Sequence, residues 1–286
     1  MARRDLRYIE QNFFRILMII SSTLIVLALG LIISSILIKG LPAVSWDMIV
    51  KTPGGGFYFG KEGGIANAII GSLYLACGAT IFASIIGIPV ALYMNVNLVK
   101  NQRLVHGIRF LLDLLWGVPS IVYGAFGFMI MIWLGIKVSL LAGIIVVGFF
   151  ILPILIRAID EGLKTVPRGL LESSLSLGAN NVIIAFRIYL KQCLPAAITA
   201  LLLSFGRAIG DAAAVLFTTG FTDRIPTSLS QPAATLPLAI FFQLSSPIPE
   251  VKTRAYAAAA ILTFIVLIIS ILARLFSKRF NKNTVK

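Results

Sequence analysis

Residues 16–38, ILMIISSTLIVLALGLIISSILI, decide the fold class, because they form a long apolar run without a single charge. A helix needs about 20 such residues to cross the hydrocarbon core of a bilayer. Basic residues precede the run, but it is too long for a signal-peptide core and no convincing small-residue cleavage site follows it. We therefore expect a first transmembrane helix that the chain retains.

Runs of similar character recur along the chain, at residues 65–99, 114–136, 138–156, 193–222 and 255–273. The chain is 58% hydrophobic and 13% charged, whereas soluble domains carry about 25% charged residues. The sequence predicts an all-α, polytopic membrane protein with about six transmembrane helices, organised as a single transmembrane domain over residues 1–286.

The formal net charge of +14 comes from basic residues that lie between and beside the apolar runs. This placement suits lipid head groups and topology signals, because cytoplasmic loops are enriched in Lys and Arg. It does not suit a nucleic-acid surface. We expect both termini in the cytoplasm, with residues 1–15 as a cytoplasmic segment. On the outer side, prolines interrupt residues 220–252, and residues 234–246 are expected to form a short interfacial or re-entrant helix.

No catalytic or cofactor site emerges from the sequence. Cys77 and Cys193 lie in or beside apolar runs and have no metal-ligand spacing. Asp160 and Glu161 are adjacent and diverge on a helix, so we interpret them as solvated loop charges rather than an acid/base pair. The sequence predicts neither a metal site nor a cofactor, and it does not predict an enzyme.

The segment between the fourth and fifth runs reads VPRGLLESSLSLGANN at residues 166–181. Pro167 suits a first helical turn, Gly178 is a natural left-handed helix terminator, and Asn180 or Asn181 can cap a following helix. The pattern predicts a short exposed helix, a sharp turn and a second helix. On geometry alone, an ordinary helical connector is an equally good interpretation.

At these residues the chain resembles the permease subunits of ABC importers. Glu172, Ser173 and Ser174, followed by Gly178, are similar to the E-A-A-x-x-x-G loop of that family, with serine in place of both alanines. The resemblance implies a MetI-like fold in which residues 167–180, within a coupling loop at 157–187, dock into a separate cytoplasmic ATPase.

Charged residues interrupt the fifth run at Arg207 and Asp211. Four residues apart on one helix, they can pair, and a charge inside the membrane usually faces the protein interior or a wet cavity. A structural pair that locks two helices is one interpretation. Recognition of an anion is the other, because a guanidinium matches phosphate oxygens. An ionised carboxylate such as Asp211 can accept a hydrogen bond from protonated phosphate but not from sulfate.

Further stretches resemble the PstA family of phosphate permeases: GIANAIIGSL at 64–73, GVPSIVYG at 117–124 and RAIGD at 207–211. The resemblance extends from about residue 64, so that 64–276 form the permease core. It places Arg157 where these permeases carry an arginine near the inner end of the fourth span. A snorkelling topology anchor is an equal alternative for Arg157.

The resemblance implies a permease for inorganic phosphate in the cytoplasmic membrane of a prokaryote. Its implied partners are a homologous PstC-like permease, a PstB-like ATPase dimer and an extracytoplasmic PstS-like phosphate-binding protein. A permease for another oxyanion or for phosphonate remains an alternative, as does an ATP-independent secondary transporter.

Overall fold

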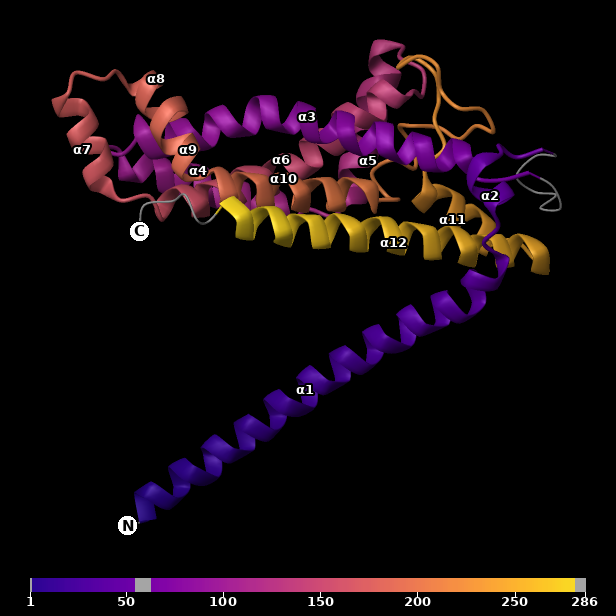
Figure 1. The fold of residues 1–286 in the computed structure, drawn as a ribbon, viewed down its shortest axis with the longest axis horizontal. Coiled ribbons are helices and arrows are strands. Elements are labelled where there is room, and N and C mark those ends of the chain that lie inside the picture. Colours follow the sequence, from indigo (N-terminus) through magenta and orange to yellow (C-terminus); the bar gives the residue numbers. More distant parts are fainter. Residues whose placement is uncertain (1, 55–62, 281–286) are drawn as a thin grey trace.

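The long helices of the body, α1 (Ala2–Gly40) excepted, run side by side along one axis (Figure 1). The computed structural model describes the backbone of residues 2–54 and 63–280, and the side chains of 10–54, 63–167 and 169–276. The body is built on α3 (Ala66–Val96), α6 (Leu140–Lys164), α10 (Leu194–Ile209) and α12 (Pro249–Phe280). Within the described residues there is no β-strand, only an isolated bridge between Pro53 and Gly63. The all-α prediction is confirmed.

The core lies where α3 packs along α6. On α3, the buried face is made of small residues such as Ala76, Ala79 and Ala83, each 0% exposed, and on α6 it is made of branched residues such as Val147 and Ile151. Helices in a bilayer associate through close packing rather than through the hydrophobic effect, which favours small residues at the contact. The small face of α3 therefore allows α6 to approach closely.

The six predicted runs correspond to four straight helices and two bent pairs. The straight helices are α1 (Ala2–Gly40), α3, α6 and α12. The first bent pair is α4 (Gln102–Gly117) with α5 (Ser120–Leu134), bent by 93°. The second joins α8 (Asn181–Ile183), the π-helical η2 (Ile184–Tyr189) and α9 (Leu190–Gln192) to α10, with a bend of 77°.

The prediction that residues 193–222 form one membrane span was wrong in its extent. Helix α10 ends at Ile209, and no helix is assigned from Gly210 to Thr235. The later part of the run is apolar because it is buried in the core that α3 and α6 form, where Ala214 and Val215 are 0% exposed. Hydropathy reports burial in lipid or in protein alike, so it could not separate the helix from the buried turn that follows it.

The bend between α4 and α5 lies in the GVPSIVYG stretch. Helix α4 ends at Gly117, Val118 is extended, and Pro119 is the N-cap of α5. Proline lacks the N–H that a continuing helix requires, and it pushes the residue before it out of the helical conformation. The Tyr123 hydroxyl then bridges the corner by donating to the Leu115 carbonyl at 3.0 Å.

Helix α1 diverges from the body and meets it only near its C-terminal end, beside α12 (Figure 1). There Gly40 lies so close to the Tyr256 backbone that a side chain at this position would collide with it. The apolar window of α1 is 0% buried, whereas that of α6 is 61% buried. Two short elements follow, η1 (Leu41–Ala43) and α2 (Trp46–Val50).

The end of the body that carries α2 also holds α11 (Leu236–Leu244), whereas α7 (Arg168–Ser176) lies at the opposite end (Figure 1). The prediction of a short helix within 234–246 is confirmed, but α11 is packed inside rather than exposed at an interface. Leu236 and Ala239 are 0% exposed. The backbone N–H of Leu236 donates to the Ser72 hydroxyl at 2.7 Å, which fixes the start of α11 against α3.

Candidate substrate cavity and coupling region

A cavity of about 750 Å³ lies between the α4–α5 corner, α6 and α10. Two of the sequence-predicted residues, Arg157 and Arg207, line it together, although they come from different helices. The remaining wall is formed mainly by the corner itself and by apolar side chains such as Phe150 and Leu203. Glu161 is the one carboxylate among the described lining residues. The structure thus brings two guanidinium groups to one cavity.

Arg207 lies in the last turn of α10, with 51% of its side chain exposed. Its guanidinium carbon lies 4.8 Å from the centroid of the Phe150 ring, a stacking contact that orients the planar group without using its donors. The nearest carboxylate oxygen, on Asp211, is 3.7 Å away, which is too long for a hydrogen bond. Most of the donor fork of Arg207 is therefore available to a ligand.

The prediction that Asp211 pairs with Arg207 is confirmed by an ion pair at 3.7 Å, but the prediction that both lie on one helix was wrong. Asp211 lies beyond the end of α10, is 4% exposed, and its Oδ1 accepts a 2.7 Å hydrogen bond from the Ala214 backbone. The carboxylate thus stabilises the turn that follows the helix. The ion pair with Arg207 is formed by the other oxygen, and the described lining of the cavity includes Arg207 but not Asp211.

Arg157 is held far more firmly than Arg207. Its Nε donates to Asp113 at 2.8 Å, and its Nη1 donates to Glu161 at 3.0 Å and to Asp160 at 3.2 Å. Its side chain is 21% exposed. Three carboxylates therefore surround this guanidinium.

Asp160 anchors this group of charges and is fully buried, with 0% of its side chain exposed. Arg109 donates to both of its oxygens at 2.9 Å, and the Asn95 amide donates at 2.8 Å. The interpretation of Asp160 and Glu161 as solvated loop charges was therefore wrong for Asp160. Glu161 is solvated as expected, with 57% of its side chain exposed, but it lies in helix α6 rather than in a loop.

Sequence reasoning missed Asn95, Arg109 and Asp113, which belong to helices α3 and α4. A signal was present: Arg109 and Asp113 lie four residues apart just before an apolar run, and Arg157 and Glu161 lie four apart just after one. Each pair is a helical i,i+4 pair. Only the tertiary structure shows that the two pairs face each other.

The predicted coupling region has the expected local structure. Helix α7 is followed by Gly178 with φ of +78°, and the Asn180 side chain caps α8 by accepting from the Ile183 N–H at 2.8 Å. Glu172 and Ser173 are exposed, whereas Ser174 is buried and donates to the Leu170 carbonyl. Leu177 at the tip is 88% exposed, so an apolar side chain projects beyond the body.

Glu172 also lines a polar hollow of about 370 Å³ between α7 and the adjacent ends of α3, α4 and α6. Arg109, Lys164 and Asn95 line the same hollow. Because Arg109, Asn95 and Arg157 all bind Asp160, this hollow and the cavity with the two arginines are lined by members of one connected group of charges.

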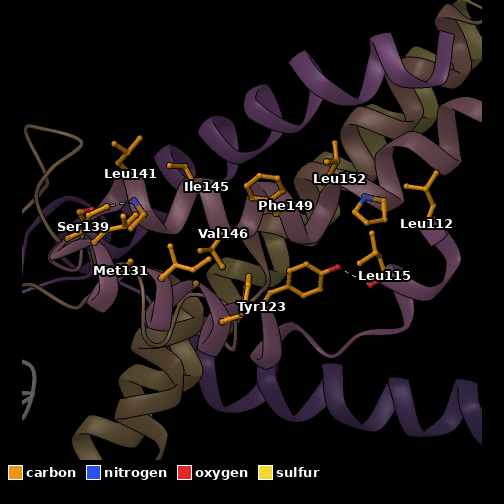
Figure 2. Close-up of a pocket in the computed structure, with 17 residues that line it drawn as sticks. Leu112, Leu115, Tyr123, Met131, Ser139, Leu141, Ile145, Val146, Phe149 and Leu152 are labelled. Carbon is orange, nitrogen blue, oxygen red and sulfur yellow. Dashed lines mark hydrogen bonds between the residues drawn. The ribbon is translucent and has the colours of Figure 1, made fainter. Parts of the chain in front are cut away.

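A second large cavity, of about 590 Å³, opens along α4, α5 and α6 (Figure 2). Its labelled walls are apolar side chains such as Leu141, Ile145 and Phe149, and its polar groups are the hydroxyls of Ser139 and Tyr123. No charged residue lines it in the described part of the chain, so its chemistry does not suit an oxyanion. The described side chains also contain no group of three or more His, Cys, Asp or Glu that could hold a metal ion.

Residues 83–282 match the family described as "Binding-protein-dependent transport system inner membrane component". The chain belongs to this family. The match covers the substrate cavity and the whole of α7, so both candidate regions lie within the part of the chain that defines this transport family.

Relatives of this inner membrane component include a protein of Pasteurella multocida (strain Pm70) called "Phosphate transport system permease protein PstA". It is 32% identical over 252 residues, which cover 88% of each chain. A protein of the same name from Yersinia pestis is 35% identical over 218 residues, covering 76% of this chain and 74% of the relative.

Solved structures share the fold of this transport component at low sequence identity. A chain of the MetNI methionine ABC transporter in an inward-facing conformation has a TM-score of 0.63 at 18% identity, covering 76% of this chain and 95% of that chain. A chain of a bacterial alginate ABC transporter has a TM-score of 0.64 at 16% identity, covering 99% of both. The MetI-like, all-α prediction is therefore confirmed.

Proposed function

We propose that the protein is a permease subunit of an ATP-driven importer and that it forms part of the path for inorganic phosphate across the cytoplasmic membrane. The observation that carries the proposal is the pair of arginines, Arg157 and Arg207, that line one cavity. Two guanidinium forks on one cavity suit a tetrahedral oxyanion, because each presents donors in the geometry of its oxygens. The names of the relatives support phosphate as that oxyanion.

In this proposal Arg207 binds the anion, Asp211 keeps the turn beneath Arg207 in place, and Arg157 provides a second guanidinium deeper along α6. The chain itself is not a hydrolase. ATP is hydrolysed by a separate PstB-like ATPase dimer, which docks on α7 around Glu172, Ser173, Ser174 and Gly178. The exposed apolar side chains around this turn, Leu175, Leu177 and Val182, support this assignment, because exposed apolar residues that lie together are typical of a protein interaction surface.

The complete importer also requires a PstC-like second permease and a PstS-like extracytoplasmic binding protein. The cavity in this chain would then be only one part of the transport pathway, and a second permease would complete that pathway. We place both termini and α7 in the cytoplasm, because basic residues concentrate before the apolar part of α1 and after the apolar part of α12.

Phosphate uptake by the whole transporter, reconstituted in proteoliposomes with its partner subunits, tests the assignment. Arg207→Lys keeps the charge but loses the planar fork, so uptake should fall by about tenfold or more. Arg224→Lys is the matched control, because Arg224 is exposed and does not line the cavity. Unchanged uptake in an assembled Arg207→Lys transporter would contradict the proposed path. Uptake of another oxyanion or of a phosphonate in place of phosphate would correct the substrate.

Labelling of single cysteines introduced at Lys51 and Arg274 in a cysteine-free background tests the topology. An impermeant thiol reagent added outside intact cells should modify the first position and not the second. The reverse pattern would invert the topology and would move α7 to the side without ATP.

A further inference from the structure

The two arginines of the substrate cavity differ in what already occupies their donors. Arg207 has one carboxylate oxygen at 3.7 Å. Arg157 donates to Asp113, Asp160 and Glu161 at 2.8 to 3.2 Å, and its Nη2 also points toward the second oxygen of Asp113 at 3.5 Å. An anion that enters the cavity therefore meets a free guanidinium at Arg207 and an occupied one at Arg157.

The three carboxylates around Arg157 are not equally fixed. Asp160 is 0% exposed and is bound by Arg109 and Asn95, so it stays in place whatever Arg157 does. Asp113 and Glu161 are 49% and 57% exposed, so water can solvate them when they leave Arg157. Partly exposed ion pairs of this kind are weak and can be exchanged.

We infer that Asp113 and Glu161 are specificity-determining residues, which hold Arg157 while the cavity is empty and are displaced from it by the incoming oxyanion. The inference rests on the proposed function, because it assumes that an oxyanion enters this cavity. Glu161 already has a second partner in Lys164, at 2.7 Å, so it can leave Arg157 and remain paired. No second cation is recorded beside Asp113 in the described chain. Release of Asp113 from Arg157 therefore costs more free energy than release of Glu161.

Displacement explains how such a site can prefer phosphate to sulfate. Phosphate that retains a proton can donate a hydrogen bond to a carboxylate that it has just displaced, whereas fully ionised sulfate has no donor and meets only repulsion. Glu161 lines the cavity and is therefore placed to accept that hydrogen bond. The carboxylates thus weaken the binding of both anions, and that of sulfate more.

A purely structural role for Asp113 is the competing interpretation, because its ion pair with Arg157 joins α4 to α6. A general electrostatic effect is a second competing interpretation, since removal of any negative charge near the cavity would strengthen the binding of an anion. The two carboxylates separate these interpretations. General electrostatics predicts the larger effect for Glu161, which lines the cavity, whereas displacement predicts the larger effect for Asp113, which lacks a second partner.

Anion binding in the cavity can be measured directly by protection of an introduced thiol. Leu203 lines the cavity one turn before Arg207 and is 58% exposed, so Leu203→Cys places a reactive group there. Cys77 is replaced by Ser, and Cys193 can stay because it is buried. The purified complex of this chain with its partner subunits is treated with a small neutral thiol reagent over a series of phosphate or sulfate concentrations at constant ionic strength.

Asp113→Asn should lower the half-protecting concentration of phosphate by roughly fivefold, the size of one partly exposed ion pair. It should lower the half-protecting concentration of sulfate by a larger factor, so that the protein binds phosphate in preference to sulfate by a smaller margin. Glu161→Gln should act in the same direction with a smaller effect. Glu10→Gln is the control for loss of one charge, because Glu10 is exposed on α1, away from the body, and it should change neither value.

Unchanged or raised half-protecting concentrations in both variants would overturn the inference while leaving the proposed function standing. A larger effect for Glu161→Gln than for Asp113→Asn would assign the result to general electrostatics instead. If Asp113→Asn does not assemble, the ratio of the half-protecting concentrations of sulfate and phosphate in Glu161→Gln decides. A purely structural role for these carboxylates would leave that ratio unchanged. Absence of protection by either anion in the parent protein would instead contradict the proposed function.

Discussion

The two walls of the candidate substrate cavity present the same functional group in opposite settings. On α6, Arg157 belongs to a group of charges anchored by a buried aspartate, whereas at the end of α10 Arg207 stacks on Phe150 and keeps most of its donors free. The difference shows that charge alone does not make an anion site, because donors must also be available. We expect the charges on the α6 wall to stabilise the fold, and Arg207 on the α10 wall to make the first contact with the anion.

The largest effect is expected from substitution of Asp160, the buried aspartate that anchors the charges on α6. Asp160→Ala leaves Arg109 without its buried partner, and breaking a buried ion pair in this way costs about 3 to 5 kcal/mol. The variant should fail to assemble or should lose much of its thermal stability, as measured by the melting of the purified subunit. Glu161→Ala, beside it and exposed, should change the melting temperature little. Equal melting temperatures for the two would remove the distinction between anchored and exposed charges.

The substitution Arg157→Lys sharpens the comparison with Arg207→Lys. Lysine cannot donate to three carboxylates in the same planar geometry, so Arg157→Lys should lower both phosphate uptake and thermal stability, the latter by about 1 to 2 kcal/mol. Arg207→Lys should lower uptake alone. If Arg207→Lys proved to be the destabilising variant, the assignment of the two walls would have to be exchanged.

The coupling region is expected to respond to backbone strain and not to crowding. Gly178 and Gly169 both have open space where a side chain would be added, but only Gly178 has a positive φ. Gly178→Val should therefore impose about 1 to 2 kcal/mol of strain on the turn, whereas Gly169→Val should not. Phosphate-stimulated ATP hydrolysis by the complex should fall in the first variant and persist in the second. Equal coupling in both would contradict the role assigned to the α7 turn.

The smallest effect is expected from Asp211→Asn. The amide oxygen can still accept from the Ala214 N–H, and the ion pair that is lost, at 3.7 Å, is weak. Phosphate uptake should change by no more than about twofold. A loss as large as that in Arg207→Lys would show that Asp211 binds the anion itself.

Local features were predictable from the sequence and tertiary ones were not. The helix–Gly178–Asn180 turn was predicted because cap and terminator residues act within a few positions of the chain. The burial of Asp160 was missed because its partners, Asn95 and Arg109, lie more than fifty residues away in the sequence. The α4–α5 corner was missed for another reason. A hydropathy run records length but not direction, and Pro119 at its break was noted only as part of a resemblance.

The α4–α5 corner has a consequence for the lipid around the protein. Helices α4 and α5 contain 16 and 15 residues, so each is only about 24 Å long or less, shorter than the ~30 Å core of a typical bilayer. Because they meet at 93°, their lengths do not add across the membrane. The exposed apolar side chains of α5, with Trp133 84% exposed at its end, thus impose a local hydrophobic mismatch. Where this helix faces lipid, the bilayer beside it has to thin, so we expect transport to depend on the acyl-chain length of the host membrane.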